Sequence, residues 1–133
     1  MKTGEDSEIG KKRLEFFKYV GERVRRYNTL FKTFNDNLVK EYDGRLTIFL
    51  FGSRARGDNR PSSDFDILIV VGEGKLEDHY LKSMKCKPPE LPVDILIVYP
   101  QDLSNPIIKQ MLADSKVIFN GLSIDLTAFQ KRR

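Results

Sequence analysis

Apolar positions in the first third of the chain recur every three or four residues, which keeps them on one side of a helix. The pattern predicts a helix from about residue 8 to about residue 41, with one apolar stripe facing the core, and Asp43-Gly44 ends it in a turn. The aromatic residues on this stripe fit a core better than a base-stacking platform. The stripe consists of Phe16, Val20, Val24, Tyr27, Phe31, Phe34 and Leu38.

Three short apolar runs follow, with the length and composition of strands. A glycine-rich turn separates the second run from residues 76–85, which are weakly periodic and fit either a helix or a loop. A proline-rich connector over residues 87–92 then leads into the third run. The runs are Leu46–Phe51, Asp64–Val71 and Leu91–Tyr99.

The last part of the chain predicts one more helix and one more strand. Asn105 and Pro106 have the residue types of an N-cap and a first helical position. Val117–Phe119 predicts a closing strand, which Asn120-Gly121 would end. The tail from Leu122 fits either a partner-docking helix or a frayed end. The helical residues expected to point inward are Ile107, Ile108, Met111 and Leu112.

These elements predict an α/β (α+β) fold: a small mixed sheet of about four strands with helices packed mainly on one face. The 133 residues and 40% apolar content suit one domain over residues 1–133, with a core at about 46–98 and a C-terminal helix and strand at about 105–120. No apolar run is long enough for a membrane span, and Met1–Asp6 lack a signal peptide's apolar run, so we expect a cytoplasmic protein. The lone Cys86 is expected to be a loop thiol and the lone His79 an exposed residue.

The net charge of +4 favours contact with polyanions. Basic residues gather on the first predicted helix, at Lys11–Arg13 and at Arg23, Arg25 and Arg26. Acidic residues are mixed among them, so a solvated helix face is the better interpretation and nucleic acid is not the expected partner.

The strongest chemical pattern is a pair of acids at the start of an apolar strand, Asp64 and Asp66. Alternate residues of a strand share a face, so these carboxylates would lie about 6 to 7 Å apart. Asp94 stands near the start of the third run, roughly 4.8 Å away if the two strands are neighbours. An ionised carboxylate in an apolar setting is costly unless it is paired or binds a metal. Three convergent acids suit Mg²⁺, and two such ions about 3.5 to 4 Å apart can assist an in-line displacement.

The segment Gly52–Gly57 supplies groups suited to phosphate, directly after the first predicted strand. Gly52 allows close backbone approach, and Ser53 adds a hydroxyl. Arg54 and Arg56 can bind phosphate oxygens in a forked geometry. The two glycines resemble a P-loop in spacing, but the residues that follow lack its Lys and Ser or Thr, which disfavours a Walker-type NTPase.

Together, Gly52-Ser53, ten intervening residues, Asp64-x-Asp66 and the later strand Asp94 resemble the DNA polymerase beta-like nucleotidyltransferase superfamily, and within it the minimal nucleotidyltransferases. The resemblance implies that Gly52 and Ser53 bind a nucleoside triphosphate. It implies that Asp64 and Asp66 hold the metals, two Mg²⁺ ions or Mn²⁺ in their place, and that Asp94 completes the catalytic metal site.

The resemblance also implies transfer of a nucleoside monophosphate, AMP from ATP, to an acceptor hydroxyl. Minimal nucleotidyltransferases are often encoded beside HEPN-domain proteins, which implies a toxin–antitoxin pair in which a tyrosine of the partner is the acceptor. Two alternatives stay open: a non-catalytic module that neutralises a partner by forming a complex, and a nucleotidyltransferase that acts on a small molecule. Turnover separates the first alternative from the enzyme.

Overall fold

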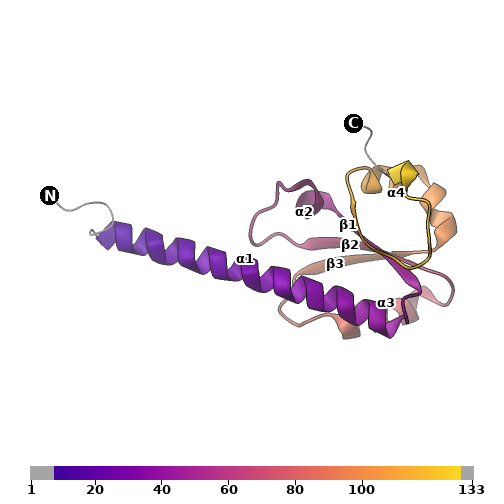
Figure 1. Ribbon diagram of the computed structural model, residues 1–133, viewed down its shortest axis with the longest axis horizontal. Helices are drawn as coiled ribbons and strands as arrows, with labels where there is room; N and C mark the ends of the chain where they lie inside the picture. The colour runs from indigo at the N-terminus through magenta and orange to yellow at the C-terminus, as the bar shows by residue number, and fades with distance from the viewer. Residues whose placement is uncertain (1–7, 130–133) are drawn as a thin grey trace.

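The computed structural model describes residues 8–129 of the chain (Figure 1). The expected long helix and strands are present, and residues 76–85, left open between helix and loop, are helical. No helix in this part of the chain is both long and apolar enough to cross a membrane. The expectation about a signal peptide concerns Met1–Asp6, outside the described residues. The elements are α1 (Glu8–Glu41), β1 (Leu46–Phe51), α2 (Gly52–Arg56), β2 (Phe65–Val71), α3 (Leu76–Cys86), β3 (Val93–Val98), η1 (Pro100–Ser104), α4 (Pro106–Leu112), β4 (Lys116–Asn120) and η2 (Thr127–Phe129).

The four strands form one mixed sheet in the order β3-β2-β1-β4. β1 pairs antiparallel with both β2 and β4, whereas β2 and β3 run parallel. The parallel pair requires a crossover, which α3 supplies. This order brings the end of β1 beside the beginnings of β2 and β3.

Both faces of the sheet are covered, which explains why the strands are almost continuously apolar. On one face, Ile48, Ile67 and Ile69 pack with residues of α1 and α3. On the other face, Phe49 and Leu68 pack with the shorter helices α4, η1 and η2. The two longer helices therefore lie together on one face, as the sequence predicted.

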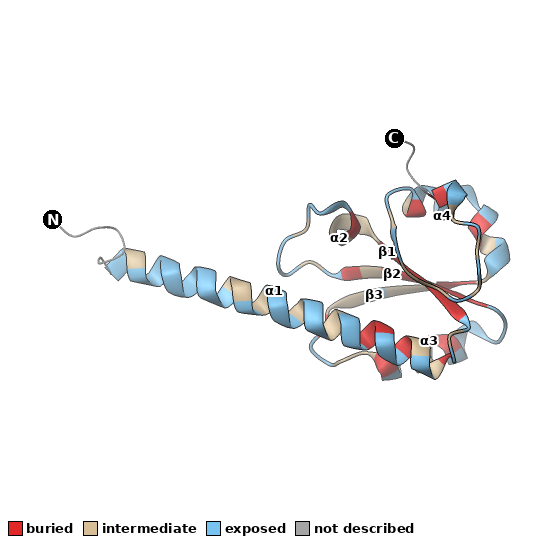
Figure 2. Cartoon of the chain, viewed as in Figure 1, coloured by how far each residue is buried: buried red, intermediate tan, exposed pale blue. Residues whose placement is uncertain are grey.

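Only the second half of α1 packs on the sheet. Phe34 and Leu38 are fully buried, and Phe31 stacks on Phe65 with ring centroids 4.4 Å apart. The first half projects beyond the sheet (Figures 1 and 2), and there Phe16 is 61% and Val24 39% exposed. The prediction that the whole stripe faces the core is therefore wrong for its N-terminal part, because the sheet does not extend beneath it.

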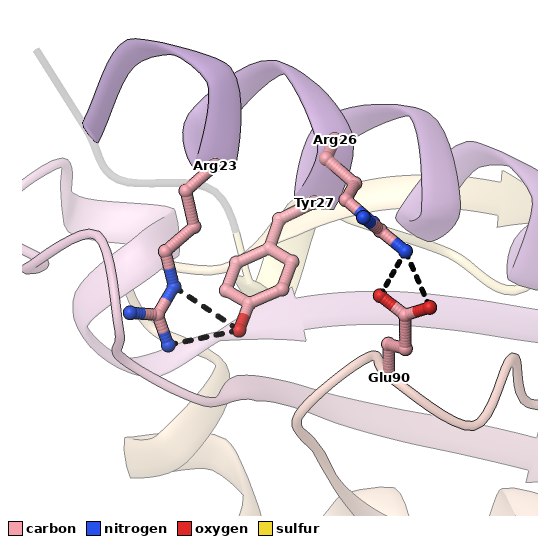
Figure 3. Close-up of polar contacts among 4 residues, drawn as sticks. All are labelled: Arg23, Arg26, Tyr27 and Glu90. Carbon is pink, nitrogen blue, oxygen red and sulfur yellow. Dashed lines mark hydrogen bonds and ion pairs between the residues drawn. The ribbon is translucent and has the colours of Figure 1, made fainter. Parts of the chain in front are cut away.

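Arg26 lies where α1, followed from its N-terminus, first contacts the rest of the protein. Its guanidinium forms an ion pair with Glu90, in the connector before β3 (Figure 3). One turn earlier, Arg23 donates to the hydroxyl of Tyr27 (Nη2 to Oη, 3.0 Å). Tyr27 itself packs against the core cluster. The Arg26–Glu90 ion pair therefore holds α1 against the connector that leads into Asp94.

Two expectations about single residues on α3 are wrong. His79 is only 9% exposed, because α3 packs against the end of α1, and Cys86 is a buried residue at the end of α3 rather than a loop thiol. In the neutral ring, His79 Nε2 donates to the carbonyl of Glu73 (2.6 Å), and Nδ1 accepts from the hydroxyl of Tyr42 (2.8 Å). Burial raises the pKa of Tyr42 to about 12.

The C-terminal elements largely follow the sequence. The Asn105 side chain caps α4 by accepting from the N–H of Ile107 (2.8 Å), as predicted. Leu112 is buried, but Ile107 is 69% exposed and does not point inward, because α4 is only seven residues long and turns a narrow face to the sheet. From Leu122 to Phe129 the tail forms no long helix, and it is not frayed either, because Phe129 packs edge-to-face on Phe49.

Candidate active site

The strand register places the acids of the sequence motif side by side. Asp66 and Asp94 are partners in the parallel β2–β3 ladder, and Phe51, the last residue of β1, is the partner of Asp66 on its other side. Asp64 lies immediately before β2. The prediction that the two acidic runs are neighbouring strands is confirmed. We call the end of the sheet formed by Phe51, Asp66 and Asp94, with the adjoining Asp64, the acidic end.

The three carboxylates of the acidic end influence one another. Asp66 is half-buried, whereas Asp64 and Asp94 are exposed. Burial raises the pKa of Asp66, the charges of Asp94 and Asp64 raise it further, and the nearby guanidinium of Arg56 opposes them. A bound cation would favour the ionised form of Asp66, which burial and the two neighbouring carboxylates disfavour.

The donor set fits a hard divalent cation. All three side chains offer carboxylate oxygens, the ligands that Mg²⁺ and Mn²⁺ prefer. Within residues 8–129, no three His, Cys, Asp or Glu side chains are arranged as a ready-made metal-binding cluster. The structure therefore brings Asp64, Asp66 and Asp94 to one end of the sheet without drawing them into a closed ligand cage.

Gly52 is packed directly against Asp66. Gly52 joins β1 to α2, and its φ of +72° is a left-handed conformation that is strained for residues with a side chain. A Cβ at this position would lie 3.1 Å from Cγ and 3.3 Å from Cβ of Asp66, and would overlap its Oδ2. Glycine is therefore required both by the turn and by the carboxylate over it.

Ser53 and Arg56 lie on the short helix that starts at Gly52. Ser53 follows Gly52 directly and is half-buried, and the helix ends where the N–H of Gly57 donates to the Ser53 carbonyl (2.9 Å). The Arg56 side chain is exposed and pairs with Asp58 (3.2 Å). The Arg56 charge also opposes the raised pKa of Asp66.

Arg54 has a role that sequence reasoning missed. Its Nε donates to the carbonyl of Ser63 (2.9 Å) and its Nη2 to that of Pro61 (3.1 Å), while the guanidinium lies over the ring of Phe65, 3.8 Å from the centroid. Burial lowers the pKa of Arg54. Arg54 thus holds the loop that leads into Asp64. The only signal in the sequence is an aromatic residue directly after Asp64, and phosphate binding by Arg54 stays a prediction.

Comparisons with known proteins give one family match and one structural match. Residues 36–121 match the family model described as Polymerase beta, Nucleotidyltransferase. A crystal structure of a candidate nucleotidyltransferase from Sulfolobus solfataricus superposes with a TM-score of 0.59 and 22% sequence identity, over 78% of this chain and 89% of that one, which shows a shared fold. No curated protein sequence gives a significant match. The family model spans most of the chain, including the whole acidic end and the turn at Gly52, so the chain belongs to the polymerase beta nucleotidyltransferase family.

Proposed function

We propose that the protein transfers a nucleoside monophosphate from a nucleoside triphosphate, with ATP as donor, to an acceptor hydroxyl. The acceptor oxygen forms a bond to the α-phosphorus, the bond from that phosphorus to the β-bridging oxygen breaks, pyrophosphate leaves, and the hydroxyl proton is released. The observation that carries the proposal is the in-register pairing of Asp66 with Asp94, beside Asp64 and the Gly52 turn.

In this proposal Asp64, Asp66 and Asp94 hold two Mg²⁺ ions, which Mn²⁺ can replace. Bound divalent ions neutralise phosphate charge and favour displacement at phosphorus. Asp66, half-buried over Gly52, has the most restricted position of the three and fixes where charge is neutralised. Asp94 is exposed on the neighbouring strand, and in the proposal it helps to activate the acceptor hydroxyl.

The triphosphate would lie along the turn that follows β1. Gly52 lets the phosphates approach the backbone closely, and Ser53 offers a hydroxyl beside it. Arg56 supplies positive charge at the acidic end, where it already counteracts the carboxylates. Catalysis of this type depends mainly on positioning and charge neutralisation, which these groups supply.

The acceptor that we propose is a tyrosine of a HEPN-type partner protein, in a toxin–antitoxin pair. Its support is the resemblance of Gly52-Ser53, Asp64-x-Asp66 and Asp94 to the minimal nucleotidyltransferases.

The test is transfer of label from each α-labelled NTP in Mg²⁺, with the protein alone and with a candidate HEPN-type partner. Wild type is compared with Asp66→Asn and Asp94→Asn, and the matched control is Asp36→Asn, which changes an exposed acid on α1. We expect label on the partner from ATP, retained by the control and reduced by orders of magnitude in the other two variants.

Three outcomes would refute or redirect the proposal. Transfer at wild-type rate by Asp66→Asn or Asp94→Asn would refute the role of the acidic end. A tight complex with the partner but no transfer from any NTP would support a stoichiometric binding module instead. Transfer to aminoglycoside-type small molecules, with none to protein, would keep the reaction and replace the acceptor.

A further inference from the structure

Most of α1 lies outside the part of the chain that matches the family, because the family model begins at residue 36. One side chain from this unmatched part, Phe31, nevertheless contacts the acidic motif of β2. Its ring stacks on that of Phe65, the residue between Asp64 and Asp66, with centroids 4.4 Å apart and ring planes 19° apart. The unmatched part of α1 is therefore in direct contact with the strand that carries Asp66.

Arg54 occupies the opposite face of the same ring. Its guanidinium carbon lies 3.8 Å from the centroid of Phe65. A stacked ring and a guanidinium this close to one centroid cannot share a face, because their atoms would overlap. Side chains from α1, β2 and α2 thus stack in turn. We call the three residues, Phe31, Phe65 and Arg54, the aromatic column.

The aromatic column ends on the loop before Asp64. Arg54 donates from Nε to the carbonyl of Ser63 (2.9 Å) and from Nη2 to that of Pro61 (3.1 Å). Within the loop, the N–H of Ser63 donates to the carbonyl of Arg60 (3.0 Å). These bonds close a short turn, and Asp64 is the next residue along the chain. The position of Asp64 therefore depends on Arg54, which in turn packs against the ring of Phe65.

Phe65 connects the aromatic column with both acidic strands. It is buried, its N–H donates to the carbonyl of Pro92 (2.8 Å), and its partner on β3 is Val93, the residue before Asp94. Neighbouring residues of a strand point to opposite faces, so Phe65 points toward α1 while Asp66 points to the other face of the sheet. A ring with both faces occupied cannot shift, and the carboxylates beside it are held with it.

We propose that Phe31 is a positioning residue for the acidic end. Through the aromatic column it holds the loop before Asp64, and so places the carboxylate that binds Mg²⁺ in the proposed function. The role in metal binding rests on that proposed function, whereas the hold of α1 on the loop does not. If Phe31 is removed, the Phe65 ring gains freedom on one face, and the guanidinium on its other face moves with it. This makes α1 part of the active site, although it carries no residue of the motif.

The other attachment of α1 at this end of the sheet is weaker. Arg26 and Glu90 form an ion pair in which both side chains are more than half exposed (Figure 3). Ion pairs on the surface contribute little, because solvent screens them. Arg26→Gln therefore separates attachment of α1 in general from the aromatic column in particular, and it should leave the loop before Asp64 unchanged.

The first test is hydrogen exchange of residues 57–64 in the metal-free full chain, well below the Tm of every variant. Phe31→Leu keeps apolar bulk but removes the ring, so exchange should become about 3- to 10-fold faster, as the loss of one aromatic pair predicts. Phe31→Tyr keeps a ring at this half-buried position and should exchange like wild type. The matched control is Phe34→Leu. Phe34 is fully buried in the same cluster, and among the described residues no ring contact joins it to Phe65. This control should lower Tm by more than Phe31→Leu does, yet leave loop exchange unchanged.

The second test measures Mn²⁺ affinity from the electron paramagnetic resonance signal of the free ion. Phe31→Leu should weaken binding by about 3- to 10-fold, in step with the loop, whereas Phe34→Leu should not. In the transfer assay, Phe31→Leu should need more Mg²⁺ for half-maximal rate, with KM for NTP unchanged. In an Arg54→Met background it should add nothing, because the aromatic column is already broken.

Unchanged loop exchange in Phe31→Leu would overturn the proposal. Equal loosening by Phe34→Leu would do so too, because the loop would then respond only to lost stability. Faster exchange with unchanged Mn²⁺ affinity would show that the loop does not position the metal ligand, which also overturns the role of Phe31. A wild type that binds no Mn²⁺ and transfers no label would refute the proposed function instead, and the exchange result would still decide whether Phe31 holds the loop.

Discussion

Replacing Arg54 by methionine tests whether this residue positions Asp64 or binds nucleotide. The substitution keeps an unbranched stem beside Phe65 but removes the donors to the carbonyls of Pro61 and Ser63 (3.1 and 2.9 Å). Those two bonds tie α2 to the loop just before Asp64. We therefore expect Arg54→Met to loosen the loop while the sheet stays folded.

The magnitude follows from the contacts. Each hydrogen bond from a charged donor is worth about 1.5–3 kcal/mol, and the bond to Pro61 belongs at the low end because it is exposed. Stacking over Phe65 adds about 0.5–1 kcal/mol. Together these contributions come to about 3.5–5.5 kcal/mol lost locally. The global Tm should nevertheless fall by at most about 10 °C, because the loop can open without the core. Disturbing a residue that orients a metal ligand typically weakens metal affinity by about 10–100-fold.

The assay is nucleotidyl transfer measured against Mg²⁺ concentration and, separately, against NTP concentration. If Arg54 positions the loop, Arg54→Met shifts the Mg²⁺ dependence, and Arg54→Lys does the same, because an ammonium lacks the fork that reaches both carbonyls. Arg45→Met, which removes an exposed guanidinium paired with Asp43 at the other end of β1, is the matched control. A raised KM for NTP with unchanged Mg²⁺ dependence and unchanged Tm would refute the reasoning and assign Arg54 to phosphate.

Three further substitutions follow from the structure. Gly52→Ala should reduce transfer strongly and should lower the free energy of unfolding by more than Gly57→Ala does. Gly57 has a similar positive φ, but nothing lies within 4 Å of a Cβ added there. Both variants share a backbone strain of about 1–2 kcal/mol, so the difference between their denaturant unfolding curves measures the crowding against Asp66. Asp66→Asn should raise Tm in EDTA at neutral pH, because the raised pKa of Asp66 makes its ionised form costly in the native state. That gain should vanish as the pH falls through the raised pKa, and Mg²⁺ should stabilise wild type but not the variant. Tyr42→Phe should cost about 1–2 kcal/mol by removing the donor to His79 Nδ1, which thermal unfolding at pH 8 measures.

The parts of the fold set by local patterns could be predicted from the sequence. The run after Asp66 is buried on both faces, and its length and composition identify a strand. The position of Asp94 beside Asp66 depended on the adjacency of two strands, and the parallel register confirms it. Asn105 identified the start of α4, because an N-cap acts within one turn of its own residue.

What the sequence could not predict depends on where an element ends relative to its neighbours. Periodicity shows that α1 has an apolar face but not how far the sheet reaches beneath it, so Phe16 was assigned to the core and is exposed. A lone polar residue carries no period at all, so the burial of His79 against Tyr42 became visible only in the packing of α3 on α1. The bonds of Arg54 to loop carbonyls have no pattern in residue type, because any residue supplies a carbonyl.

The geometry of the acidic end is set largely by residues that take no part in it. A slip of one residue in β2 would turn Ile67 and Ile69, both fully buried under α1 and α3, toward the opposite face, and would move Asp66 with them. The apolar part of the strand therefore fixes the register, and Asp66 and Asp94 take their positions from it. The sheet tolerates carboxylates at this end because they destabilise only the ends of the strands, while the remaining length of each strand packs on both faces. The contact of Gly52 with Asp66 ties the chemistry directly to the backbone, so this position should tolerate substitution least.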